Sequence, residues 1–99
     1  MTVRVSGYAR TRLHAIWRWV RDASSRERAD RLEARLLERA SSLSRQPLKG
    51  PAEPLLAFKQ KGHRYLLFGR YKIIYRVEGE IIHITDFFDT KQHPSRMRG

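Results

Sequence analysis

Hydrophobic residues in the first quarter of the chain recur at two different spacings. Val3 and Val5 alternate with polar neighbours, which predicts a short strand with one buried face. From Gly7 onward the spacing becomes helical, and Ser6 is well placed to cap the N-terminus of that helix. The apolar face of this first helix is formed by Ala9, Leu13, Ile16, Trp17 and Val20.

A second amphipathic pattern follows after a short link. Ser24 and Glu27 have the spacing of a capping box, which predicts that a helix starts there. This helix ends before Pro47, because proline disfavours helical backbone at the residue that precedes it. Its apolar stripe consists of Ala29, Leu32, Leu36, Ala40 and Leu43. The two helices therefore predict an αα-hairpin.

The second half of the chain has the pattern of a sheet. Residues 55–58 form a short apolar run, which we interpret as a first edge strand. Three strand-like stretches follow at 63–68, 71–77 and 81–88, separated by tight-turn sequences with glycine. This order predicts an α+β fold, in which a short N-terminal strand precedes an αα-hairpin packed on one face of a mainly antiparallel sheet of three to five strands.

The chain length fits one domain over residues 1–99, with residues 89–99 as a basic C-terminal tail. We expect the sheet face away from the helices to be more open to solvent or to a partner. The core is predicted to lie between helices and sheet. It is expected to contain Leu13, Trp17, Leu36, Leu43, Tyr75 and Ile84.

The charge of the chain narrows the choice of partner. It has 21 lysines and arginines but only 10 acidic residues, which gives a formal net charge of +11. The excess is spread over both halves of the chain, and it favours nucleic acid or an acidic protein as partner. Cysteine is absent, which excludes a disulfide scaffold, a thiolate metal site and a cysteine nucleophile. The four histidines lack metal-ligand spacing, so we expect no metal and no cofactor.

Neither a signal peptide nor a membrane-spanning segment is predicted. No apolar run approaches the ~20 residues that a transmembrane helix needs. The N-terminus also lacks the apolar region of a signal peptide. We therefore expect a cytoplasmic protein that does not contact membranes.

Several motifs in the same order resemble the RelE/ParE toxin superfamily. The first half contributes Val5-Ser6-x-x-Ala9 and Leu13-x-x-Ile16-Trp17. The second half contributes the sheet segment 64–79, with its Tyr-x-Ile-x-Tyr-Arg-Val core at 71–77, and the exit segment 89–94. The resemblance covers nearly the whole chain and implies the toxin of a type II toxin–antitoxin pair, with a cognate acidic antitoxin similar to ParD.

The superfamily divides into two functional branches that share one fold, so the fold cannot choose between them. RelE-like members cut mRNA on the ribosome without a metal, mainly with Lys, Arg and Tyr side chains. This resemblance makes Lys72, Lys91 and His93 the candidate catalytic residues of an endonuclease. The set is incomplete, because His63 and Tyr65 stand in the region of an expected lysine pair and no tyrosine follows Lys91.

Other details resemble the ParE branch, whose members inhibit DNA gyrase by binding. They are Arg64-x-x-x-Phe68-Gly69-x-Tyr71 and Asp89-Thr90-Lys91-Gln92-x-Pro94. One departure is Phe88-Asp89, where ParE relatives often carry a histidine. We therefore favour a gyrase inhibitor that arrests growth and stabilises plasmids. The alternatives are a ribosome-dependent mRNA endonuclease and a basic nucleic-acid-binding domain.

The candidate residues for binding the target or the antitoxin combine exposed cations with one aromatic side chain. Trp19 lies off the apolar stripe of its helix, and the cations belong to the predicted sheet and to the segment after it. The set is Trp19, Arg64, Arg70, Lys72, Arg76 and Lys91.

Overall fold

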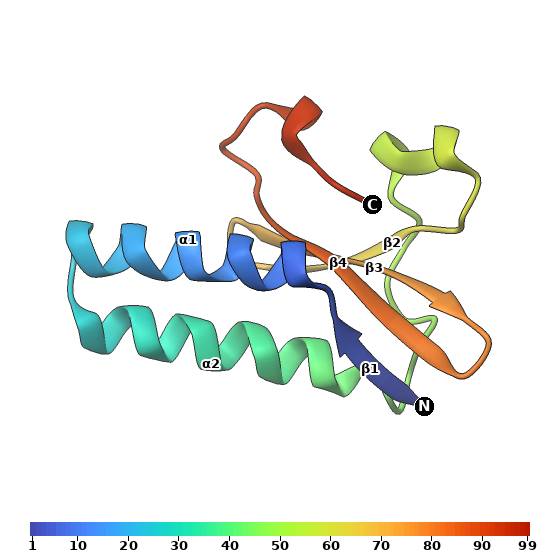
Figure 1. The fold of residues 1–99 in the computed structure, drawn as a ribbon, viewed down its shortest axis with the longest axis horizontal. Helices are drawn as coiled ribbons and strands as arrows, with labels where there is room; N and C mark the ends of the chain where they lie inside the picture. Colours follow the sequence, from blue (N-terminus) through green and yellow to red (C-terminus); the bar gives the residue numbers. More distant parts are fainter.

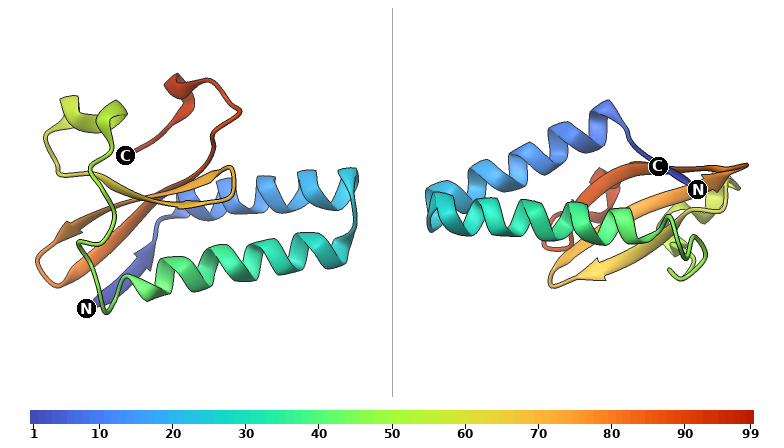
Figure 2. Two further views of the ribbon diagram at one scale, coloured as in Figure 1. Left: turned by 180° about the vertical axis from the view of Figure 1, so that it is seen from behind. Right: turned by 90° about the horizontal axis from the view of Figure 1, so that it is seen from below.

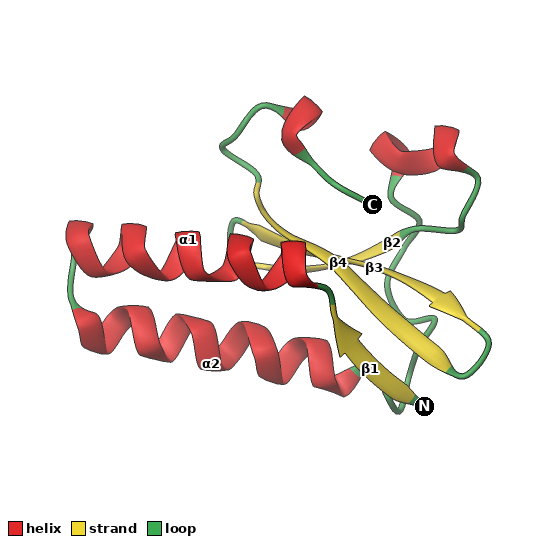
Figure 3. Ribbon diagram, viewed as in Figure 1, coloured by secondary structure: helices red, strands yellow, loops and turns green.

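The computed structural model describes residues 1–99 as two layers, a helical hairpin and a four-stranded sheet (Figure 1). Two short 3₁₀ segments lie on the far side of the sheet from the hairpin (Figure 3). The elements in chain order are β1 (Thr2–Val5), α1 (Gly7–Ala23), α2 (Arg26–Ser42), η1 (Pro54–Lys59), β2 (Arg64–Phe68), β3 (Tyr71–Glu78), β4 (Ile81–Asp89) and η2 (Pro94–Arg96). This is the predicted α+β fold.

The sheet has the strand order β1-β4-β3-β2. The β2–β3 and β3–β4 pairs are antiparallel, whereas β1 runs parallel to β4, so the sheet is mixed. Gly69 and Gly79 have φ values of +57° and +58°, each at the first of the two residues that join neighbouring strands. A positive φ at that position is what a type II′ hairpin turn requires, and glycine adopts it without steric cost.

One bulge in β4 decides which side chains face the helices. Tyr75 pairs with Ile84, but Ile74 pairs with Asp86, so Thr85 is the extra residue. An extra residue shifts the alternation of side chains by one position. Ile84 therefore packs with Phe87 against the helices, while Asp86 turns to the opposite face.

Both helices begin at a serine whose hydroxyl accepts a backbone hydrogen bond. The Oγ of Ser6 accepts from the amide of Ala9 at 3.0 Å, as predicted. The cap of α2 was predicted one residue too early. Ser25, not Ser24, accepts from the amide of Arg28, so Glu27 occupies the second helical position and no capping box forms.

The main core lies between the hairpin and the sheet. Five of the six predicted core residues belong to it. Trp17 is the exception, because it lies half-buried between the helices, where its Nε1 donates to Asp30 Oδ1 at 2.8 Å. The buried members of this core are Ala9, Leu13, Leu36, Ala40, Leu43, Leu66, Tyr71, Ile73, Tyr75, Ile82, Ile84 and Phe87.

The far face of the sheet is not open as predicted. Residues 54–59 form the 3₁₀ segment η1 rather than an edge strand, with Pro54 at its start and Gln60 in the left-handed conformation at its end. η1 and the C-terminal segment together cover this face. A second apolar cluster, formed by Leu56, Ile74, Phe88 and Met97, lies beneath them. Met97 is buried in this cluster and the Arg98 amide donates to Asp86 Oδ2 at 3.0 Å, so the last residues of the basic C-terminal tail contact the sheet.

None of the helices has both the length and the apolar composition that crossing a membrane would require.

Candidate functional site

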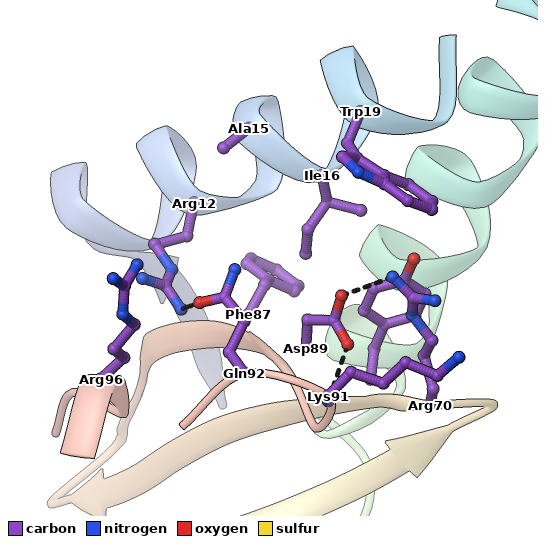
Figure 4. Close-up of a pocket in the computed structure, with 11 residues that line it drawn as sticks. Arg12, Ala15, Ile16, Trp19, Arg70, Phe87, Asp89, Lys91, Gln92 and Arg96 are labelled. Atoms are coloured by element: carbon purple, nitrogen blue, oxygen red, sulfur yellow. Dashed lines mark hydrogen bonds and ion pairs between the residues drawn. The ribbon is translucent and has the colours of Figure 1, made fainter. Parts of the chain in front are cut away.

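A groove of about 620 Å³ runs between α1 and the C-terminal end of β4 (Figure 4). Its walls come from four places in the chain: α1, the β2–β3 turn, the end of β4 and the segment that follows. The residues that line it are Arg12, Ala15, Ile16, Trp19, Arg70, Tyr71, Phe87, Asp89, Lys91, Gln92 and Arg96. Three candidates from the sequence, Trp19, Arg70 and Lys91, are thus brought together here.

The α1 wall follows directly from helical spacing. Positions 12, 15, 16 and 19 lie three or four residues apart and so share one face of the helix. Ile16 packs against the main core, while Trp19 is 57% exposed one turn further along. Along α1, the wall of the groove therefore changes from a side chain packed on the core to an exposed indole.

An ion pair holds the opposite wall. Arg70 Nη2 lies 2.6 Å from Asp89 Oδ2 and donates a hydrogen bond to it. The other oxygen of Asp89 accepts from the amide of Lys91 at 3.0 Å. Thr90 binds the Arg70 carbonyl through both its amide and its hydroxyl. The β2–β3 turn and the end of β4 are thereby joined into one rigid edge.

The guanidinium of Arg70 also lies near two aromatic rings. It is 4.9 Å from the centroid of the Trp19 ring and 5.4 Å from that of Tyr71. Contacts of this kind are favourable because the ring face is electron-rich. They orient the exposed indole of Trp19 over the groove.

Cations surround the remaining opening. Arg12 reaches from α1 to β4 and the segment after it, where Nε lies 3.4 Å from Asp86 Oδ1 and Nη2 donates to Gln92 Oε1 at 3.4 Å. Burial raises the pKa of Asp86 above its ordinary value, against the opposing effects of the Arg98 amide and the Arg12 charge. The exposed side chains of Lys91 and Arg96 form no ion pair within the protein.

The groove suits binding of an amphipathic acidic ligand. The exposed Trp19 and the half-buried Ile16 offer apolar surface above the buried rings of Tyr71 and Phe87, and Lys91 and Arg96 offer free charge. Sites of this kind combine an apolar lining with a few polar groups that fix orientation. The only carboxylate of the lining, Asp89, is already bonded to Arg70.

The three residues proposed for RNA cleavage do not share this groove. Lys72 lies on the far face of the sheet, where Nζ is 2.7 Å from Glu53 Oε1 and 4.3 Å from the Tyr65 ring centroid. His93 caps η2 by accepting from the amide of Ser95 through Nδ1. Only Lys91 lines the groove.

The remaining two candidates contact their own chain. Arg64 donates from Nη1 to the carbonyls of Gly50 at 2.7 Å and of Leu48 at 3.3 Å, and so holds the loop that leads to η1. Arg76 pairs with Glu78 at 3.3 Å on the adjacent part of β3.

Sequence reasoning missed Arg12, Asp89 and Arg96 as groove residues. Arg12 could have been found, because it lies seven residues before Trp19 and therefore on the same helix face. The position of Asp89 in the groove depends on the bulge in β4. The position of Arg96 there depends on the path of the C-terminal segment. No group of His, Asp or Glu side chains is arranged to hold a metal ion.

Comparisons with known proteins place this geometry in a family. The sequence profile described as "ParE toxin of type II toxin-antitoxin system, parDE" matches residues 3–94. A solved structure, "Chromosomal ParDE TA system from P. aeruginosa", shares the fold with a TM-score of 0.76 and 21% identity over 90% of this chain and 95% of that chain. No curated protein is significantly similar in sequence. Since the profile spans nearly all of the fold, the chain belongs to the ParE toxin family of type II toxin–antitoxin systems.

Proposed function

We propose that this toxin inhibits DNA gyrase by binding it, and that a cognate acidic antitoxin neutralises the toxin by occupying the groove between α1 and β4. Gyrase acts in the cytoplasm, so the proposal also places the toxin there. No cofactor or metal takes part, because the proposed action is binding and not chemistry.

The observation that supports the antitoxin site is the chemistry of the groove. An exposed Trp19, an apolar floor and the free charges of Lys91 and Arg96 lie around one concave surface. An amphipathic segment with acidic residues matches each of these features. With a net charge of +11 on the toxin, an acidic segment is also drawn to it from a distance.

The observation that favours gyrase over mRNA is the dispersal of the acid–base candidates. Cleavage by attack of a 2′-hydroxyl needs a base, an acid and cations around one phosphate. Here Lys72 is bonded to the buried Glu53, and His93 serves as a cap, so neither accompanies Lys91 in the groove. The geometry supports a binding protein better than an endonuclease.

Two assays on the purified toxin test the target. We expect inhibition of gyrase supercoiling and intact mRNA on translating ribosomes. Ribosome-dependent cleavage that Lys91→Ala or His93→Ala weakens by about 10²–10³ would instead establish the endonuclease alternative. Failure to inhibit supercoiling, with mRNA also intact, would refute gyrase as the target.

Lys72 needs a different variant in these assays. Lys72→Ala leaves the buried carboxylate of Glu53 without a partner, so a loss of activity could reflect unfolding. The double variant Glu53→Gln with Lys72→Met removes both charges together. If that folded variant still inhibits gyrase, Lys72 has no part in the target surface.

A further inference from the structure

Four arginines form a continuous stripe along α2. Arg28, Arg31, Arg35 and Arg39 follow one another at intervals of three or four residues, which places them on one flank of the helix. All four side chains are exposed. At a rise of 1.5 Å per residue the stripe is about 16 Å long.

These arginines form no ion pair within the protein. α2 also carries Glu27, Asp30, Glu33 and Glu38, yet no arginine of the stripe forms an ion pair with them. Asp30 instead accepts a hydrogen bond from Trp17. The only hydrogen bond from an arginine side chain of the stripe to the rest of the protein runs from Arg39 Nη2 to the Leu67 carbonyl at 3.3 Å.

A fifth cation continues the stripe beyond the end of α2. Lys49 donates from Nζ to Ser42 Oγ at 2.9 Å, which holds its charge beside the last turn of the helix. Viewed from below, α2 has α1 on one side and the β2–β3 hairpin on the other, and no helix or strand covers the side that faces the viewer (Figure 2, right). The groove described above contains no residue of α2.

We propose that this stripe, formed by Arg28, Arg31, Arg35, Arg39 and Lys49, binds the phosphodiester backbone of double-stranded nucleic acid. A linear row of free cations matches a linear row of phosphates, and the arginine fork suits phosphate oxygens. A protein ligand, by contrast, is usually anchored by aromatic or aliphatic side chains in a pocket, and the members of this stripe are all cations. The binding is independent of base sequence, because contacts with phosphate groups are the same whatever the bases are.

The inference does not rest on gyrase as the target or on the antitoxin groove. It concerns the toxin alone with nucleic acid and uses residues outside the groove. Gyrase inhibition and duplex binding can therefore each succeed or fail separately.

Fluorescence anisotropy with a short labelled duplex tests the proposal. Five phosphates, one neutralised by each cation of the stripe, give a slope of about −4.5 for log affinity against log salt, hence a loss of about 500-fold in affinity between ~50 and ~200 mM salt. The variant Arg28→Gln, Arg31→Gln, Arg35→Gln, Arg39→Gln should lose most of that slope and of the low-salt affinity. Glutamine has a helix propensity close to that of arginine, so the variant should fold.

The control removes the same charge elsewhere. The variant Arg4→Gln, Arg10→Gln, Arg18→Gln, Arg45→Gln also removes four exposed arginines, and it should retain most of the slope. Equal losses in the two variants would mean diffuse attraction and would overturn the proposal, as would no binding by the unaltered toxin. Circular dichroism checks that both variants are folded.

Two further arms separate the ligand classes. The first compares duplex DNA with duplex RNA of the same sequence. Binding of either duplex that depends on the stripe supports the proposal, and the tighter of the two shows whether the stripe prefers DNA or RNA. Polyglutamate of similar charge is the third ligand. Binding of polyglutamate as tight as that of the duplexes, with the same loss in the stripe variant, would show that the stripe recognises acidic protein and would overturn the assignment to nucleic acid.

Discussion

Arg70 and Asp89 join two separate turns of the chain through an ion pair of 2.6 Å, and the same carboxylate accepts the amide of Lys91. Both partners are largely shielded from solvent. Hydrogen bonds to charged groups that are shielded in this way contribute about 1.5–3 kcal/mol. The pair thus fixes the wall of the groove.

We expect Asp89→Ala to lower the free energy of unfolding by about 1.5–3 kcal/mol, because Arg70 loses its partner and the Lys91 amide loses its acceptor. Urea unfolding measures this. Asp22→Ala is the matched control, since Asp22 pairs with Arg21 at 2.9 Å on the exposed surface. That control should show no measurable change, and equal losses in the two variants would contradict a special role for Asp89.

Two adjacent leucines test the packing of the hairpin on the sheet. Leu36 is fully buried in the main core, whereas Leu37 is 38% exposed. Leu36→Ala should therefore cost about 2–5 kcal/mol of stability, and Leu37→Ala should stay near the level of a surface substitution, about 0.5 kcal/mol. Chemical denaturation of the two variants measures the difference. Similar losses of stability in the two variants would show that the apolar face of α2 is assigned to the wrong side of the helix.

The sequence was sufficient to predict the elements that follow a regular period. The stripes of α1 and α2 and the alternation in β3 predicted the helices, the strands and five of six core residues, because each depends only on local spacing. The prediction that Trp17 belongs to the main core was wrong, because hydrophobic spacing does not show whether a side chain has a polar partner. Its indole N–H has a polar partner in Asp30 of the other helix, and this bond holds the half-buried ring between the two helices and outside the main core.

The parts that were missed depend on contacts between distant segments. Residues 55–58 are apolar enough for a strand, but Pro54 starts a 3₁₀ turn, and Leu56 then packs with Met97 of the C-terminal segment, about 40 residues further along the chain. The bulge at Thr85 has no signature in the sequence, yet it directs Asp89 into the groove. Trp19, Arg70 and Lys91 could be identified singly as candidates, but not as neighbours.

His63 should make the stability of the toxin depend on pH. Burial lowers the pKa of His63 below its ordinary value of 6.5, with added effect from the charges of Arg76, Lys59 and Lys61. Below pH 6.5 the unfolded chain therefore takes up a proton that the folded chain resists. The free energy of unfolding should fall with decreasing pH through this range, by at most about 1.4 kcal/mol per pH unit.

Urea unfolding at about pH 7.5 and about pH 5.5 measures this dependence. His63→Leu should remove most of it, because the unfolded chain then has no proton to gain at that position. The exposed His14 supplies the comparison, and His14→Gln should leave the dependence in place. A slope unaffected by His63→Leu would mean that another group titrates.

The ion pair between Lys72 and Glu53 is expected to be structural. The Glu53 side chain is fully buried, and its second oxygen accepts the amide of Leu55 at the start of η1. Lys72→Met should cost about 3–5 kcal/mol, because an unpaired carboxylate is left in the interior. Adding Glu53→Gln should recover most of that loss. Arg76→Met, whose partner Glu78 is exposed, should have no measurable effect.

The groove should contain the dominant contact with the antitoxin, and Trp19 is its most exposed large hydrophobic side chain. Aromatic residues in such positions often contribute 2 kcal/mol or more to a protein interface, so Trp19→Ala should weaken antitoxin binding by about 30-fold or more. Isothermal titration calorimetry with the cognate antitoxin measures the affinity. Phe58 on η1 is also exposed and lies outside the groove, which makes Phe58→Ala the matched control with little expected effect.

The dependence of binding kinetics on salt distinguishes the contribution of the charged side chains of the groove from that of Trp19. The free charges of Lys91 and Arg96 should accelerate association with an acidic segment, and this acceleration should decrease as salt is added. Lys91→Gln with Arg96→Gln should therefore slow association at low salt, whereas Trp19→Ala should mainly speed dissociation. Stopped-flow kinetics resolve the two rates. An association rate indifferent to salt, or an affinity unchanged by Trp19→Ala, would place the antitoxin on another surface.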